Sequence, residues 1–98
     1  MMKFMVGDVV EILSIGHGTK ITRRGVVTEV VPEEHAPKEI NLPRHIGGAR
    51  GYESYVVFTS TKNTPLAKLV GGKFNKETDR YFWPRAGNLT LVRRARKS

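Results

Sequence analysis

Short runs of β-branched and aromatic residues, separated by glycine and proline, recur along this 98-residue chain. Runs of about four to eight such residues between turn residues are typical of β-strands. The pattern predicts five strands, with a 3₁₀ turn over 85–88 before the last one: Val9–Leu13, Val26–Val31, Tyr52–Thr59, Arg80–Trp83 and Leu89–Val92. Five short strands joined by turns favour an all-β barrel or sandwich in a single domain.

Glycine and proline set the expected limits of these strands. Val10 and Ile12 share one face of the first strand and are expected to point into the core. Residues 14–24 contain Gly-His-Gly and are expected to form a loop with a flexible tip. Gly25 is expected to mark a bulge or a close backbone approach, and Pro32 to end the second strand because it cannot donate to a ladder.

Two long segments lack a clear strand pattern and are interpreted as insertions, 32–51 and 60–79. In the second insertion, Thr64 and Pro65 resemble the start of a helix, so one short helix is expected there. The run 93–98 has four cations and no acid, which is typical of a solvated tail. The chain is therefore divided into a domain over 1–92, containing both insertions, and a basic C-terminal tail over 93–98.

Three segments together resemble a known fold. Val6–Ile12 looks like the opening strand of SH3-like barrels, and Arg24–Val30 is similar to the KOW motif with its glycine among apolar residues. Trp83–Val92 resembles the fourth strand, 3₁₀ turn and closing strand of that fold. The resemblance implies a single five-stranded SH3-like barrel of the KOW-like kind. Such barrels occur in ribosomal proteins, elongation factors and small phage proteins, where they bind RNA, DNA or a protein surface.

The positive charge is concentrated in the second half of the chain. Seventeen Lys and Arg residues oppose nine Asp and Glu, a net charge of +8, of which residues 1–40 contribute −1 and residues 41–98 contribute +9. A polyanion is the natural partner of so basic a segment, because neutralising phosphates releases counterions. A solubilising basic surface is the simpler alternative.

The chain offers little chemistry for catalysis. It has no cysteine, which excludes disulfides, thiolate metal sites and thiol nucleophiles, and agrees with a reducing compartment. Its three histidines lack the spacing of zinc sites, and Glu33, Glu34 and His35 are interpreted as solvated polar residues. We therefore expect no enzyme activity, no metal and no cofactor. Because the N-terminal apolar stretch is too short for a signal peptide and no later stretch could span a bilayer, a cytoplasmic protein is expected.

Cations and aromatic residues alternate in the basic half, a combination suited to RNA or single-stranded DNA, where cations follow phosphates and rings stack on bases. Phe82 is expected inside and Trp83 partly exposed; Phe74 is either an exposed ring or the anchor of its insertion. The favoured hypothesis is a non-catalytic nucleic-acid-binding module, and the alternative is a protein–protein interaction module docking on a larger assembly through an acidic partner. The predicted nucleic-acid-binding residues are Arg44, His45, Arg50, Tyr52, Lys62, Lys73, Phe74, Lys76, Arg80, Tyr81, Trp83, Arg85, Arg93 and Arg94.

Overall fold

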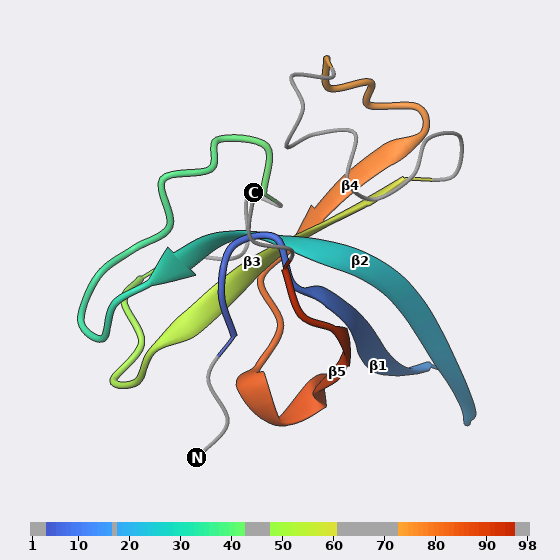
Figure 1. Ribbon diagram of the computed structural model, residues 1–98, viewed down its shortest axis with the longest axis horizontal. Helices are drawn as coiled ribbons and strands as arrows, with labels where there is room; N and C mark the ends of the chain where they lie inside the picture. The colour runs from blue at the N-terminus through green and yellow to red at the C-terminus, as the bar shows by residue number, and fades with distance from the viewer. Residues whose placement is uncertain (1–3, 17, 43–47, 61–72, 96–98) are drawn as a thin grey trace.

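The computed structural model describes residues 4–16, 18–42, 48–60 and 73–95, and contains one antiparallel sheet of five strands (Figure 1). The strand order is β4-β3-β2-β1-β5, which confirms a mostly-β fold. The strands and the 3₁₀ helix η2 are β1 (Val9–Gly16), β2 (Thr19–Val31), β3 (Ser54–Ser60), β4 (Asp79–Phe82), η2 (Ala86–Asn88) and β5 (Leu89–Arg93). The short helix expected near Thr64 and Pro65 lies outside the described residues.

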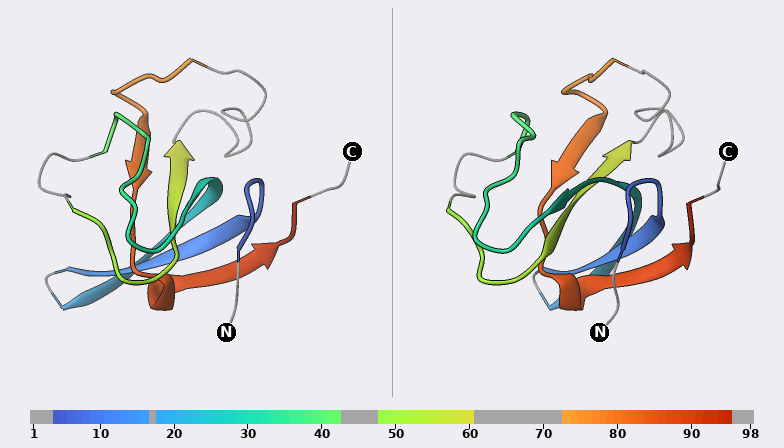
Figure 2. Two further views of the ribbon diagram at one scale, coloured as in Figure 1. Left: turned by 90° about the vertical axis from the view of Figure 1, so that its left-hand side faces the viewer. Right: turned by 60° about the vertical axis from the view of Figure 1, so that its left-hand side comes forward.

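The sheet is strongly curved, and β3 and β4 cross over β1 and β5 (Figure 2). Pairing between the described strands runs from β4 at one edge to β5 at the other, and no ladder joins these two edges. The sheet is therefore open, and the closed barrel that the sequence predicted is not confirmed.

The first two strands form a longer hairpin than the sequence predicted. Their pairing continues from Val9↔Val26 to Gly16↔Thr19, so the expectation of a loop over 14–24 is wrong. The β-branched residues on both sides of the Gly-His-Gly tip favour extended backbone, which explains why pairing reaches the turn. The second strand ends at Val31, directly before Pro32, as predicted.

The sheet buries apolar side chains on both faces. The first cluster lies on the face of Tyr55 and Val57, and the second on the face of Val56 and Phe58, since alternate residues of β3 point to opposite faces. The first cluster consists of Phe4, Val10, Ile12, Val27, Tyr55, Val57 and Leu89. The second consists of Val26, Val31, Val56, Phe58, Tyr81 and Trp83, with Leu42 and Phe74 packed against it. Both insertions thus contribute side chains to the second cluster.

A bulge in β2 adjusts which side chains reach the first cluster. In the β2–β3 ladder, Val27 pairs with Val57 and Glu29 with Val56, which leaves Thr28 as the extra residue. The shift explains why Val27 and Val30 pack on the same cluster although three positions separate them.

Gly25 lies where two strands approach closely. A Cβ atom on this residue would be 2.6 Å from the carbonyl oxygen of Phe58 and 2.6 Å from Cγ1 of Val57. Only glycine fits without a shift of the backbone, which confirms the expected close approach.

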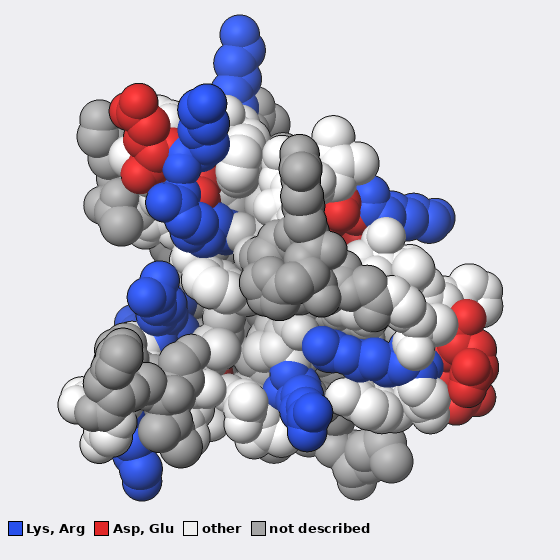
Figure 3. Space-filling model, turned by 180° about the vertical axis from the view of Figure 1, so that it is seen from behind, with Lys and Arg blue, Asp and Glu red and all other residues white. Residues whose placement is uncertain are grey.

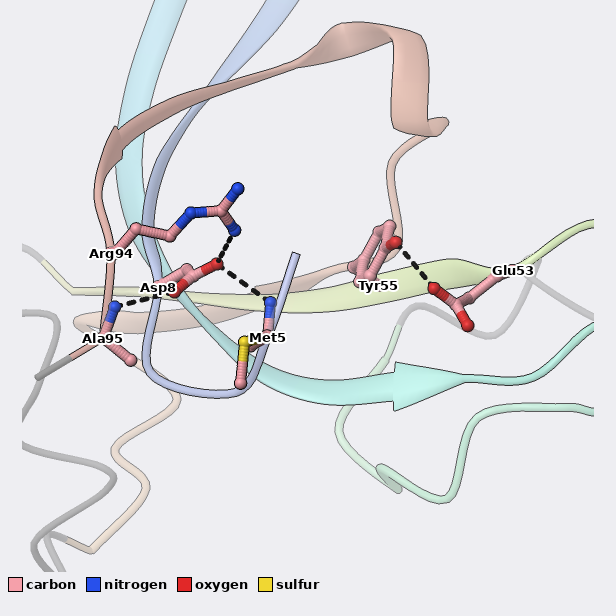
Figure 4. A network of polar contacts seen from close by, with 6 residues as sticks. All are labelled: Met5, Asp8, Glu53, Tyr55, Arg94 and Ala95. Carbon is pink, nitrogen blue, oxygen red and sulfur yellow. Dashed lines mark hydrogen bonds and ion pairs between the residues drawn. The ribbon is translucent and has the colours of Figure 1, made fainter. Parts of the chain in front are cut away.

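A buried carboxylate ties the two ends of the described chain together (Figure 4). Asp8 accepts hydrogen bonds from the backbone N–H groups of Met5 (2.9 Å) and Ala95 (2.7 Å). It also pairs with the guanidinium of Arg94 at 3.0 Å. Arg93 is the last residue of β5, and the next two residues, Arg94 and Ala95, both donate hydrogen bonds to Asp8. The first part of the predicted tail therefore packs against the sheet.

Candidate nucleic-acid interface

A tight turn before β4 presents the clearest group of predicted site residues. The carbonyl of Asn75 accepts hydrogen bonds from the N–H groups of Thr78 (3.1 Å) and Asp79 (2.8 Å). In return, the buried Asp79 carboxylate accepts from the Asn75 N–H at 2.9 Å. The Asn75 side chain also accepts from the N–H of Glu77 at 2.9 Å. These bonds fix residues 75–79 and so fix the positions of the side chains that flank them.

Phe74, directly before this turn, stacks on Tyr81 of β4. The ring centroids are 5.5 Å apart and the planes are inclined by 27°. Tyr81 is buried and lies against Phe58, with centroids 5.1 Å apart. Phe74 is therefore an anchor of its insertion, and since it is half-buried it still exposes part of its ring.

A groove of about 300 Å³ opens beside this stack. Its walls come from the first insertion on one side, and from the turn and β4 on the other. It is lined by Asn41, Leu42, Phe74, Lys76, Asp79, Arg80 and Tyr81. The sequence analysis did not single out Asn41 and Leu42. Leu42 is an apolar residue within a Pro/Gly-rich loop, which could have indicated that this loop packs against an apolar surface.

Cations stand at the rim of the groove. Lys76 and Arg80 line it and are exposed, and Lys73 is exposed two residues before the turn. The Arg80 Nη1 atom donates to the Lys76 carbonyl and, at 2.7 Å, to the Asp79 carbonyl, which holds the guanidinium over the turn. Glu77 is also exposed here, so the rim carries both signs of charge with cations in excess.

Arg50 and Trp83, both predicted to bind nucleic acid, contact each other. The Arg50 guanidinium lies over the Trp83 ring at 3.8 Å and donates to the carbonyls of Trp83 (2.7 Å) and Pro84 (3.0 Å). Trp83 is only 3% exposed, and its indole N–H donates to the Ser54 hydroxyl at 2.7 Å. The expectation of a partly exposed Trp83 is therefore wrong, because the face it points to is covered. Phe82 packs against the first cluster as a half-buried side chain.

The other predicted residues lie away from the groove lining. Tyr52 is 43% exposed, with Arg50 6.0 Å from its ring centroid. Arg85, Arg93 and Arg94 are exposed. Arg94 forms an ion pair with Asp8. Seen from behind, the molecule carries Lys and Arg at several separate places rather than in one continuous patch (Figure 3). Three predicted site residues lie outside the described part of the chain: Arg44, His45 and Lys62.

The Tyr55 hydroxyl has a clearly shifted pKa. Burial raises the pKa of the Tyr55 hydroxyl above its usual value, and the hydrogen bond that it donates to Glu53 at 2.8 Å raises it further (Figure 4). A backbone hydrogen bond at Phe4 acts in the opposite direction.

The described residues include neither a metal-binding cluster nor a membrane-spanning helix. No group of three or more His, Cys, Asp and Glu residues is placed to hold a metal ion there. In the same part of the chain, no helix is long and apolar enough to cross a membrane.

Comparison with protein-family models, with curated proteins and with solved structures finds no match for this chain.

Proposed function

We propose that this protein is a non-catalytic module that binds RNA or single-stranded DNA at the groove between its two insertions. The observation that carries the proposal is a partly exposed phenyl ring, Phe74, beside two exposed cations, Lys76 and Arg80, along one groove.

The aromatic part of the site suits an unpaired base. Phe74 is backed by Tyr81, and Tyr81 by Phe58, so the exposed ring rests on a rigid column and loses little freedom on binding. Stacking of one base on such a ring contributes about 1–3 kcal/mol and accepts any base, because each has a π-face. This predicts low sequence selectivity.

The cationic part suits the phosphate backbone. Lys73, Lys76 and Arg80 are exposed and follow the chain along the turn into β4. Three phosphate contacts with a single strand give a slope of about −2 for log affinity against log salt, at roughly −0.7 for each contact. Arg80 retains donors for a phosphate, since only its Nη1 atom is used by the turn.

Binding of a fluorescently labelled, unstructured oligonucleotide over a salt series tests this site. The double variant Lys76→Gln/Arg80→Gln is expected to bind more weakly, with the slope reduced to about −0.7. Phe74→Leu keeps an apolar anchor but loses the flat ring, so its affinity is expected to fall by about tenfold while the slope stays unchanged. Lys38→Gln, an exposed cation that does not line the groove, is the matched control. Wild-type protein that does not bind at low salt would rule the site out.

We also infer that the open sheet is that of an SH3-like barrel of the KOW-like kind. The strand order, the 3₁₀ turn η2 between β4 and β5, and the close approach at Gly25 support this assignment. A binding module of this kind without cysteine fits a cytoplasmic, non-enzymatic role.

A protein-interaction module is the second candidate, and exposed apolar side chains favour it. Met5, Val6 and Val92 are exposed. The Met5 N–H donates to Asp8, and Val92 lies on β5, which pairs with β1. A stoichiometric protein partner that remains after nuclease treatment, together with no oligonucleotide binding, would favour this candidate.

A further inference from the structure

The β1–β2 hairpin is a two-stranded ribbon whose outer half extends beyond the core. The Ile12 side chain is buried, and pairing continues for four more residues beyond it, to Gly16↔Thr19. At about 3.4 Å per residue, this outer part is roughly 13 Å long. In Figure 1 the ribbon ends at the lower right of the view, and β4 and the turn before it lie at the upper right.

One face of the ribbon carries cations. Lys20, Thr22 and Arg24 alternate along β2, so their side chains share a face, and all three are exposed. Residues 12–28 contain three cations and no acid. The third cation, Arg23, is on the other face, where its guanidinium lies 5.5 Å from the Phe82 ring centroid.

The neighbouring carboxylate does not neutralise this face strongly. Glu11 lies 3.7 Å from the Arg24 guanidinium, with side chains 37% and 61% exposed. Ion pairs between side chains this exposed are weak, so a phosphate can compete for Arg24.

We propose that the Lys20–Thr22–Arg24 face of the β1–β2 ribbon is a second nucleic-acid contact, which enters the major groove of double-stranded DNA. The proposal rests on the proposed function only in assuming a nucleic-acid partner, because it uses a different surface. It depends on the paired ribbon that the structure forms over residues 14–24, where the sequence predicted a loop.

The dimensions support a duplex groove. The major groove of B-DNA is about 12 Å wide and 8.5 Å deep and admits a two-stranded ribbon. Lys20 and Arg24 are four residues apart on β2, or roughly 13 Å, so they can reach phosphates on the two walls of the groove. The Thr22 hydroxyl lies between them and can donate to or accept from a base edge. In duplex RNA the major groove is too narrow for such a ribbon, so DNA is the expected partner.

The test compares a DNA duplex of about two helical turns with a single strand of the same length and with duplex RNA. Wild type is expected to bind duplex DNA more tightly than duplex RNA. The double variant Lys20→Ala/Arg24→Ala is expected to lower the slope of log affinity against log salt for duplex DNA by about 1.8, at roughly 0.9 for each contact. Single-strand binding is expected to stay unchanged. Lys20→Arg/Arg24→Lys keeps both charges and is expected to retain the wild-type slope, which separates lost charge from lost folding.

The outcomes distinguish the two sites. If the groove variants Lys76→Gln/Arg80→Gln weaken single-strand binding while Lys20→Ala/Arg24→Ala leaves duplex binding unchanged, the ribbon proposal is overturned and the proposed function stands. Equal binding of duplex DNA and duplex RNA would also overturn it. Loss of duplex binding alone in the Lys20→Ala/Arg24→Ala variant supports the ribbon whatever the groove variants do.

Discussion

Replacement of Gly25 by alanine tests whether the close approach of β2 and β3 is correctly placed. The new Cβ would lie 2.6 Å from the Phe58 carbonyl oxygen and 2.8 Å from Cγ2 of Thr59. A carbon normally stays about 3.3–3.6 Å from a carbonyl oxygen, so the strands must separate by roughly 0.7–1 Å. Overpacking of this kind costs about 1–3 kcal/mol, and the stiffer unfolded chain of alanine returns about 0.4–1 kcal/mol.

With about 2 kcal/mol for the overpacking and about 0.7 kcal/mol returned, the net expectation for Gly25→Ala is a loss of about 1.3 kcal/mol, or a Tm lowered by roughly 5–10 °C in a domain of this size. Thermal unfolding followed by far-UV circular dichroism measures the change. Gly87→Ala is the matched control, because nothing lies within 4 Å of a Cβ at that position; it is expected to raise the Tm by a few degrees. If Gly25→Ala is as stable as wild type, the pairing of β2 with β3 at this point is wrong.

Three further changes test particular contacts. Arg50→Ala is expected to lower the free energy of unfolding by about 2 kcal/mol, because two hydrogen bonds to carbonyl groups and a cation–π contact are lost. The fluorescence of Trp83, the one tryptophan in the sequence, should also shift to the red in the folded variant. An unchanged emission spectrum would argue against the contact between Arg50 and Trp83. Asp8→Ala leaves the N–H groups of Met5 and Ala95 without their buried acceptor and is expected to cost about 2–3 kcal/mol in urea denaturation. A change below about 0.5 kcal/mol would show that the carboxylate does not hold the two ends together. Tyr55→Phe tests the pH dependence of stability. Because the pKa of Tyr55 is raised above 10.0 in the folded state, the folded protein keeps a proton that the unfolded chain loses. The wild type should therefore lose stability as pH rises beyond 10.0, and the variant should lose less. Parallel pH profiles for the two proteins would contradict the raised pKa.

Local signals in the sequence located much of the sheet. Pro32 has no N–H to donate to a strand ladder, so its position at the end of β2 was predictable. Gly25 has no Cβ, so its position at a close approach of two strands was also predictable. The alternation of Val10 and Ile12 placed both in the core for the same reason.

The errors came from long-range contacts. Trp83 was expected near the surface because a strand with one buried face cannot hide two successive rings. The structure buries both faces, since Leu42 and Phe74 from the two insertions cover the second cluster. The local pattern gives only a weak sign that a loop folds back over a sheet, namely an apolar residue such as Leu42 within the loop. The hairpin was missed because glycines at its tip were read as a flexible loop, although the β-branched residues beside them favoured strands.

The candidate groove was predictable only in part. Phe74, Lys76 and Arg80 were named from composition, but their meeting depends on the turn held by Asn75 and Asp79. That turn is defined by hydrogen bonds between side chains and backbone, and the sequence alone does not show which of them form.

In the proposed complex, an unpaired strand lies along the groove beside the Phe74–Tyr81 stack. The most direct test of this arrangement is a titration of ¹⁵N-labelled protein with an unstructured oligonucleotide at low salt, followed by amide chemical shifts. We expect the largest shifts over residues 73–81 and at Asn41 and Leu42, with small shifts at Met5, Val6 and Val92. Amide shifts that stay unchanged throughout, or that are confined to those three exposed apolar residues, would contradict the claim.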